Sequence, residues 1–261
     1  MPVYIVAPEH AHTHTIIFLH GRDSTAEEFA AELFESQASD YRFLRNIFPS
    51  IRWVFPSARS RVSARFGGQL SQWFDIWACE SPQERKELQH AGIKDSLEEL
   101  EEIIADEVAL LEGKANCIFL AGISQGCSTT VLKLLTCTHQ QSTPFAGLIG
   151  FSSWLPFQAE IGEYAMSKFT LCTRLRSQFR LPEITQSLAQ ATASALETPV
   201  FLNDDTVVPI ENGEALERSL RELGMNVKWR RYQKGGHWIH EPVGVDDMVA
   251  FIKACMGLNS L

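Results

Sequence analysis

Short apolar runs alternate with amphipathic stretches along most of the chain. The runs are rich in β-branched and aromatic residues, which is typical of strands buried on both faces of a sheet. They are Thr15–Leu19, Ile51–Phe55, Cys117–Ala121, Ala146–Ser152, Pro199–Leu202 and Val227–Tyr232. The last run alternates apolar with polar residues, as a strand at a sheet edge does.

Apolar residues spaced three and four apart predict helices between these runs. The longest such stretch is 82–111, and others cover 127–135, 216–223 and 245–252. Alternating strands and helices predict an α/β fold, a mainly parallel central sheet with helices on both faces. We expect one domain over residues 1–261. Residues 57–77 and 157–198 lack a clear period, and the second stretch is long enough for a lid or cap insertion.

Composition narrows the class of protein. The 261 residues carry 23 Lys and Arg against 32 Asp and Glu, a formal net charge of −9. This acidic balance argues against a nucleic-acid partner. No run approaches the roughly 18 apolar residues of a membrane span, and no signal-peptide pattern is present. The six cysteines form no C-x-x-C pair and match no zinc pattern, so we expect reduced thiols and no zinc site built from them. Together these features predict a cytoplasmic protein.

Two patterns of small or polar residues bear on chemistry. Gly122-Ile123-Ser124-Gln125-Gly126 follows a predicted strand and precedes a predicted helix, which is typical of the turn that exposes a nucleophilic serine. By contrast, His10, His12 and His14 alternate and fit either a surface strand or a metal site. The absence of an obviously paired carboxylate favours the strand.

A nucleophilic serine needs a histidine base and a carboxylate that orients it. Candidates follow the last two predicted strands: Asp205, with Asp204 as its rival, and His237, with His240 as its rival. The backbone N–H groups of Gln125 and Arg22 are placed to bind an oxyanion. His20 comes too early in the chain for the base and is interpreted as a residue that stabilises the turn.

Six short segments spread over nearly the whole chain carry a family resemblance. They are Phe18-Leu19-His20-Gly21, Gln72-Trp73-Phe74-Asp75-Ile76, Gly122 to Gly126, Trp154-Leu155-Pro156, Asp205 to Pro209 and Gly236-His237. In these segments and in their order, the chain resembles the acyl-protein thioesterase / phospholipase–carboxylesterase family of α/β-hydrolases, its fungal members most.

This resemblance implies hydrolysis of carboxylic esters or acyl thioesters by Ser124, Asp205 and His237, without metal or cofactor. It places the segment Trp73-Phe74-Asp75 beside the acyl-binding site. We expect Trp73, Phe74 and Leu155 to bind the acyl group, and packing in the core is the alternative. The substrate is then an acylated small molecule or protein, and a weak homodimer is expected.

Two loops that touch the expected site are shorter than in the family, at 22–24 and 202–205. Both loops motivate the first of two alternatives to a general esterase, and the loop at 202–205 alone supports the second. One is a hydrolase, lactonase or acyl-transfer enzyme dedicated to one small-molecule pathway. The other is an inactive hydrolase fold that serves as a binding module.

Overall fold

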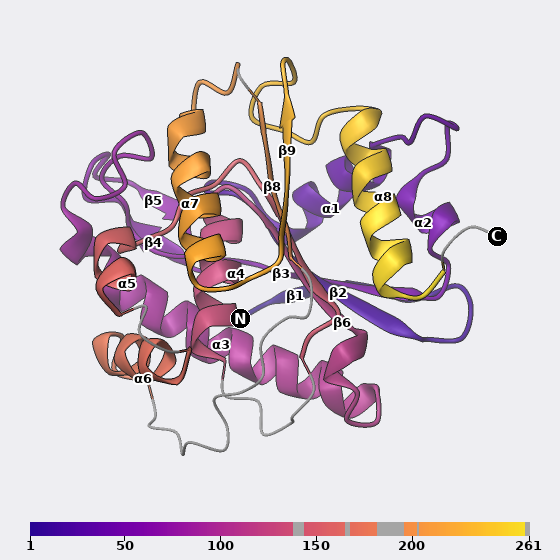
Figure 1. The fold of residues 1–261 in the computed structure, drawn as a ribbon, viewed down its shortest axis with the longest axis horizontal. Coiled ribbons are helices and arrows are strands. Elements are labelled where there is room, and N and C mark those ends of the chain that lie inside the picture. The colour runs from indigo at the N-terminus through magenta and orange to yellow at the C-terminus, as the bar shows by residue number, and fades with distance from the viewer. Residues whose placement is uncertain (138–143, 165–167, 182–195, 203, 259–261) are drawn as a thin grey trace.

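A seven-stranded sheet runs through the middle of the molecule (Figure 1). The computed structural model describes residues 1–137, 144–164, 168–181, 196–202 and 204–258. The strands lie in the order β1-β3-β2-β6-β7-β8-β9. Their bounds are β1 Val3–Val6, β2 His14–Leu19, β3 Ile51–Pro56, β6 Ile118–Ile123, β7 Gly147–Phe151, β8 Leu196–Leu202 and β9 Val227–Tyr232. Among these seven described strands, β1 is antiparallel to its neighbour β3, and the other neighbouring pairs are parallel.

Helices cover both faces of this sheet. Helices α1 (Ala26–Glu35) and α8 (Val243–Cys255), with the short α2 (Leu44–Ile47), share one apolar cluster with the strands. Helices α3 (Gln89–Leu110), α4 (Gln125–Thr136) and α7 (Ile210–Glu222) share the cluster on the other face. Helices α5 (Gln158–Tyr164) and α6 (Lys168–Gln178) pack beside them, and short 3-10 helices cover Lys86–Leu88 and Ala115–Cys117. The predicted α/β fold is confirmed.

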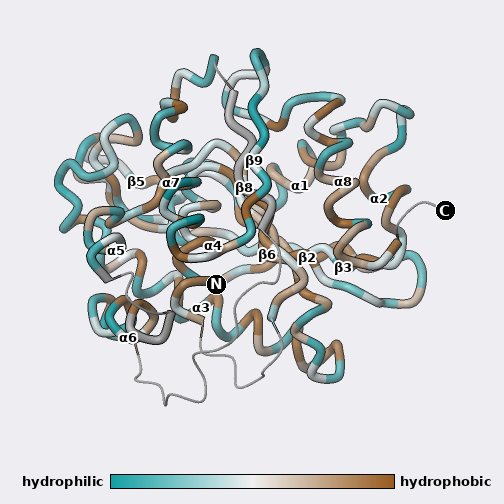
Figure 2. The backbone as a smooth tube through the Cα atoms, viewed as in Figure 1, coloured by the Kyte–Doolittle hydropathy of each residue, from teal (hydrophilic) through white to brown (hydrophobic). Residues whose placement is uncertain are grey.

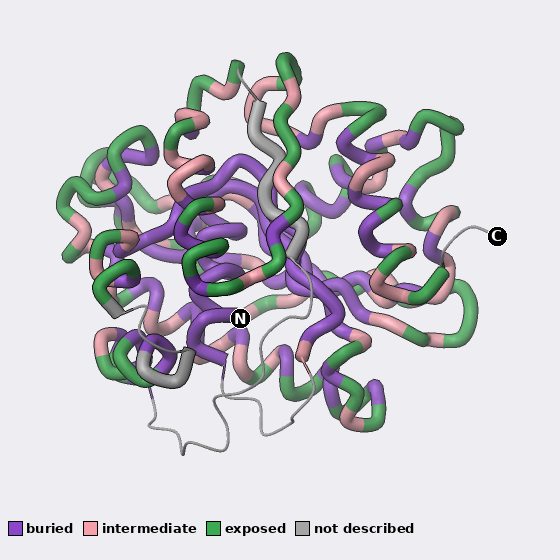
Figure 3. Tube along the Cα trace, in the orientation of Figure 1, coloured by how far each residue is buried: buried purple, intermediate pink, exposed green. Residues whose placement is uncertain are grey.

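Hydropathy and burial coincide along the chain. Strands β2, β3, β6 and β7 are predominantly apolar and mostly buried, and helix α4 is buried along its whole length. The outer helices have an inward apolar side and an outward polar side (Figures 2 and 3). In α3, for example, Leu97, Leu100 and Ile104 are buried, while neighbouring acidic residues stay at the surface. Burial of such a stripe holds a helix on a sheet.

Several elements go beyond the predicted set. Strand β1 adds an antiparallel edge, and 57–77 contains the hairpin of β4 (Ser60–Val62) and β5 (Gln69–Ser71). Helix α1 begins at a capping box: the Thr25 side chain accepts from the Glu28 N–H, and the Glu28 carboxylate accepts from the Thr25 N–H. The predicted helix over 82–111 begins only at Gln89, after a 3-10 turn.

Candidate active site

Four of the predicted site residues follow the carboxyl ends of parallel strands. Arg22 follows β2, Ser124 follows β6, Asp205 follows β8 and His237 follows β9. Parallel strands end at the same edge of their sheet, so these loops meet there. Chain segments separated by up to about two hundred residues are thereby assembled into one site.

Ser124 occupies a strained turn between β6 and α4. Its backbone has φ 54° and ψ −125°, a conformation that costs a non-glycine residue about 1–3 kcal/mol. The Ser124 N–H donates to the carbonyl of Phe151 at 2.8 Å, and the Ser153 hydroxyl donates to the Ser124 carbonyl at 2.8 Å. The end of β7 therefore holds the turn in this shape.

The two glycines of the motif permit this turn because neighbouring backbone atoms lie too close for a side chain at either position. A Cβ on Gly122 would lie 2.5 Å from the Cys127 nitrogen, and one on Gly126 would lie 2.4 Å from the His20 and Leu19 carbonyl oxygens. No side chain fits at such distances. The glycines thus let α4 start directly against the end of β2.

Asp205 and His237 are in direct contact. Asp205 Oδ2 lies 2.7 Å from His237 Nδ1, and the Asp205 side chain is fully buried. Burial raises the pKa of Asp205, but hydrogen bonds from His237 and from the Val208 and Val207 N–H groups outweigh it and lower the pKa below its usual value. An ionised Asp205 accepts from Nδ1–H, which leaves Nε2 of His237 as the basic nitrogen.

Asp204 also acts on the histidine loop. Its carboxylate accepts from the Gly236 N–H at 2.9 Å and from the Gly235 N–H at 3.2 Å, and these bonds, the one from Gly236 foremost, lower the pKa of Asp204. The two adjacent carboxylates therefore bind different parts of the histidine loop. Asp205 holds the ring of His237 and Asp204 holds the backbone that leads to it.

The two backbone groups expected to bind an oxyanion border Ser124. Gln125 is the first residue of α4, where helix N–H groups lack partners within the helix. A Cβ on Gly21 would stand 3.5 Å from Ser124 Cβ, so the loop that carries Arg22 lies against the serine. The Asp23 N–H donates to the Ser71 carbonyl at 2.7 Å, which ties this loop to β5.

Buried polar side chains hold these loops together. The Gln125 side chain accepts from the Trp73 N–H at 2.9 Å and donates to the Phe74 carbonyl at 2.7 Å. The indole N–H of Trp73 donates to the His20 carbonyl at 2.8 Å. His20 accepts at Nε2 from the Ala58 N–H and contacts the Gly21 carbonyl through Nδ1. Burial lowers the pKa of His20, in keeping with a neutral ring.

Ser124 and His237 line a common pocket of about 560 Å³. Its charged lining comes from Arg22, Asp23 and Glu32, and Cys79 adds a thiol. The remaining lining is mainly apolar, from Phe29, Phe66, Leu70, Ile123, Val207 and Trp238. The site therefore combines a serine hydroxyl and an imidazole with an apolar surface.

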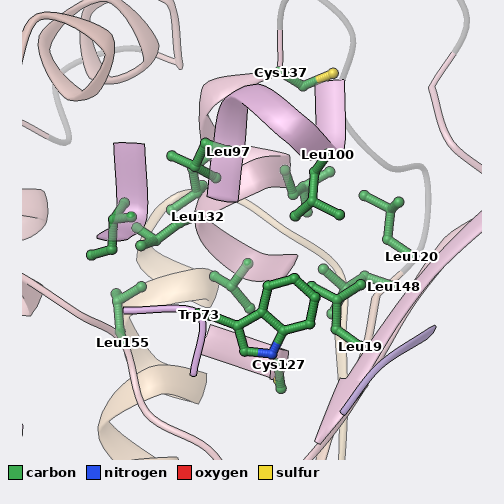
Figure 4. Close-up of a cluster of buried hydrophobic side chains, with 14 of the residues drawn as sticks. Leu19, Trp73, Leu97, Leu100, Leu120, Cys127, Leu132, Cys137, Leu148 and Leu155 are labelled. Carbon is green, nitrogen blue, oxygen red and sulfur yellow. The ribbon is translucent and has the colours of Figure 1, made fainter. Parts of the chain in front are cut away.

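Three predicted substrate-binding residues lie elsewhere. Trp73, Phe74 and Leu155 are at most 1% exposed and belong to the core cluster on the α3–α4 face. Figure 4 shows Trp73 and Leu155 among the leucines of that cluster. The structure does not bring these side chains into the pocket. Trp73 and Phe74 contact the site through their backbones, which the Gln125 side chain binds.

The expected lid or cap over 157–198 is described only in part, because 165–167 and 182–195 lie outside the described residues. The described part forms α5 and α6, which pack next to α4 and α7. None of its described residues lines the pocket. A lid at this place remains a prediction.

Sequence reasoning missed several residues that form the pocket. Phe66 belongs to a segment without clear periodicity, and Phe29 belongs to α1, which was not predicted. The capping box at Thr25 and Glu28 is the signal that would have located α1. Trp238 adjoins His237 in sequence, and this adjacency is the signal that would have placed it at the site.

The strand–turn–helix around Ser124, set in a parallel sheet with helices on both faces, defines an α/β-hydrolase. The sequence profile of the phospholipase/carboxylesterase family matches residues 2–178. The chain belongs to this family. The matched region includes Ser124 but ends before Asp205 and His237.

Relatives and solved structures agree with this family. Acyl-protein thioesterase 1 of Gibberella zeae is 26% identical over 250 residues, 93% of this chain and 90% of that one. Acyl-protein thioesterase 1 of Cryptococcus neoformans is 30% identical over 159 residues, so the match spans 60% of either chain. The crystal structure of Zea mays acyl-protein thioesterase 2 has a TM-score of 0.71 at 22% identity, covering 98% of this chain and 99% of that one.

One relative carries a different description. A rice protein named as a probable inactive carboxylesterase is 24% identical over 234 residues, which cover 85% of this chain and 77% of the rice protein. Family membership alone therefore does not establish activity, and the site has to carry that argument.

Proposed function

We propose that this protein is a serine hydrolase that cleaves carboxylic esters or acyl thioesters through Ser124, Asp205 and His237. The observation that carries the proposal is the contact of 2.7 Å between Asp205 and His237, in a pocket that His237 shares with a strained Ser124. A merely structural serine has no need of this backbone strain. An inactive binding module has no need of a carboxylate bonded to an imidazole beside it.

In the proposed reaction, Nε2 of His237 takes the proton of Ser124 Oγ as the oxygen attacks the ester or thioester carbonyl. The tetrahedral oxyanion accepts hydrogen bonds from the Gln125 and Arg22 N–H groups. Asp205 stabilises the imidazolium that forms. Protonated His237 then gives its proton to the departing alcohol or thiol, and the acyl group stays on Ser124.

Deacylation repeats these steps with water. His237 removes a proton from the water, which attacks the acyl carbonyl of Ser124. Collapse of the second tetrahedral species releases the carboxylic acid and returns the proton to Ser124. No metal or cofactor takes part in this proposal.

The acylated substrate is a small molecule or a protein, and we propose that the enzyme acts in the cytoplasm, with a weak homodimer as its assembly. All six cysteines are free thiols, as a reducing compartment favours. Among the described residues, no helix is long and apolar enough to cross a membrane.

The test is hydrolysis of p-nitrophenyl esters with acyl chains of two to sixteen carbons, followed by acyl thioesters of the best length. Ser124→Ala should lower kcat/KM by about 10⁴-fold or more, because the attacking oxygen is lost. The matched control is Ser177→Ala, which removes an exposed hydroxyl on α6 and should hydrolyse like the wild type. Ordinary turnover by Ser124→Ala would refute the proposal.

Covalent labelling distinguishes an enzyme from a binding module. A serine-reactive fluorophosphonate should add once to the wild-type chain and not to Ser124→Ala, as read by intact mass. An intact chain that folds but takes up no label would support the inactive alternative.

A further inference from the structure

We propose that the side chain of Arg22 binds a carboxylate carried by the ester substrate, so that the preferred substrates are monoesters or monothioesters of short dicarboxylic acids. This inference rests on the proposed hydrolase function and adds a specificity to it. It uses the guanidinium group of Arg22, whereas the mechanism above uses only the backbone N–H of this residue.

Arg22 is a cation inside the reactive pocket. It lines the same cavity as Ser124 and His237, and its loop lies against the serine. Most of the uncharged lining is apolar, from Phe29, Leu70 and Trp238 among others. A single guanidinium in an apolar pocket favours a ligand of opposite charge more strongly than the same group would in water.

The guanidinium of Arg22 lacks the partners that comparable arginines have. Its Nη1 atom is buried and has no hydrogen-bond partner. No ion pair of Arg22 occurs within the part of the chain that the structure describes. Nearby arginines do pair, however: Arg59 with Glu99, Arg61 with Asp95 and Arg65 with Glu80. A buried donor without a partner is costly, and a ligand is one way to satisfy it.

The Phe66 ring stabilises the positive charge of Arg22 but leaves the N–H donors of the guanidinium unpaired. The Arg22 guanidinium carbon lies 5.5 Å from the centre of the Phe66 ring. That of Arg65 lies 5.6 Å from the same centre. Such a contact stabilises a cation but does not supply a hydrogen-bond acceptor of the carboxylate kind. Arg65 has Glu80 for that purpose, whereas Arg22 keeps N–H groups for a ligand.

The charge balance of the pocket favours a carboxylate over a phosphate. Asp23 and Glu32 also line the cavity, and both are exposed. One guanidinium compensates one negative charge, and the second charge of a phosphate would remain next to these acids. The backbone N–H of Arg22 would bind the oxyanion, and its guanidinium would bind the carboxylate. The distance between the reacting carbonyl and the carboxylate can therefore be no longer than the reach of one arginine side chain. A short dicarboxylic monoester meets this condition.

The test compares two esters of equal size. One is the p-nitrophenyl monoester of glutaric acid, and the other carries a carboxamide in place of the free carboxylate. We expect the wild type to prefer the carboxylate in kcat/KM by about tenfold to a hundredfold, the range for a hydrogen bond to a charged group. Arg22→Met should abolish this preference and Arg22→Lys should restore part of it.

The ratio of the two kcat/KM values is the readout, because any change in the oxyanion site affects both esters alike. Arg65→Met is the matched control. This substitution removes the other guanidinium that contacts the Phe66 ring. Arg65 does not line the pocket, so the ratio should stay unchanged. Equal hydrolysis of both esters by the wild type, or a preference that survives Arg22→Met, would overturn the inference while the hydrolase proposal stands.

A binding measurement separates the two proposals. Calorimetry with monomethyl glutarate, on Ser124→Ala chains with and without Arg22→Met, reports the carboxylate contact without any hydrolysis. We expect the second substitution to weaken binding by about tenfold or more. Unchanged binding would refute the role of Arg22. Weakened binding together with no hydrolysis of any ester by the wild type would retain the carboxylate site and refute the hydrolase.

Discussion

Gly92 lies where α3 meets the segment that the Gln125 side chain holds. A Cβ at this position would stand 2.4 Å from Phe74 Cα, 2.8 Å from Phe74 Cβ and 3.0 Å from the Trp73 carbonyl oxygen. Ordinary contacts begin at 3.4 Å. The substitution Gly92→Ala therefore requires the helix and the segment to separate by about 1 Å, the difference between 3.4 and 2.4 Å.

Two opposing effects determine how much Gly92→Ala changes the free energy of unfolding. Alanine in place of glycine within a helix ordinarily adds about 1 kcal/mol to the free energy of unfolding. Overpacking of a close-packed core costs about 1–3 kcal/mol, and here the obstructing atoms include backbone, which cannot rotate away. We expect the upper end of that range, for a net loss of about 2 kcal/mol and a fall in Tm of roughly 4–8 °C.

The assay is urea and thermal unfolding of Gly92→Ala beside Gly162→Ala. Gly162 lies within α5 and has no atom within 4 Å of the added Cβ, so its substitution should raise the free energy of unfolding by about 0.5–1 kcal/mol. The Gly92 variant should also lose the proposed ester turnover, because the backbones of Trp73 and Phe74 hold Gln125 beside Ser124. If Gly92→Ala were as stabilising as Gly162→Ala, the packing argument would be refuted.

Three further predictions concern the residues that position the site. Gln125→Leu leaves the Trp73 N–H and the Phe74 carbonyl unpaired in the core, so the free energy of unfolding in urea should fall by about 2–5 kcal/mol; a fall below 1 kcal/mol would contradict this. Asp204→Ala removes both acceptors of the glycine loop before His237, so kcat should fall about 10- to 100-fold with little change in Tm, and wild-type kcat would exclude the positioning role. Burial lowers the pKa of His20 below 6.5, so unfolding takes up a proton and the free energy of unfolding should decrease as pH falls below 6.5, by at most about 1.4 kcal/mol per unit. His20→Gln should flatten that slope in urea titrations between about pH 5 and pH 7, and identical slopes would show that another group carries it.

The hydrophobic pattern of the sequence was sufficient to predict the strands and helices whose apolar residues recur with a clear period. The apolar runs of the central sheet and the stripe of α3 were predicted because an apolar strand or helix face needs a partner. The edge strand β1 and the β4–β5 hairpin were missed. Strand β1 has only four residues and pairs with β3, about fifty residues further along the chain. Strands β4 and β5 have three residues each, several of them polar, so neither gives an apolar run.

The sequence pattern also does not predict the direction in which a side chain points. Trp73, Phe74 and Leu155 are apolar residues in segments that resemble the family, and sequence does not tell whether such residues face a pocket or the core. In the structure they face the core, while Phe66 of the hairpin lines the pocket. Asp204 was considered only as a rival of Asp205, whereas the structure shows it bonded to the backbone beside His237.

The sequence by itself determined the class of fold, the turn that carries Ser124 and the chain order of serine, acid and histidine, because these depend on local periodicity and on residues close together in the chain. The tertiary structure alone decided that Asp205 contacts His237 and that the Gln125 side chain binds the backbones of Trp73 and Phe74. It also decided that Arg22 lines the pocket and has a buried Nη1 atom without a hydrogen-bond partner. The hydrogen bonds among them join residues 32, 51 and 52 positions apart, and the pocket is lined by residues from several loops. They depend on which strands lie side by side, and that arrangement results from burying the whole sheet between two layers of helices.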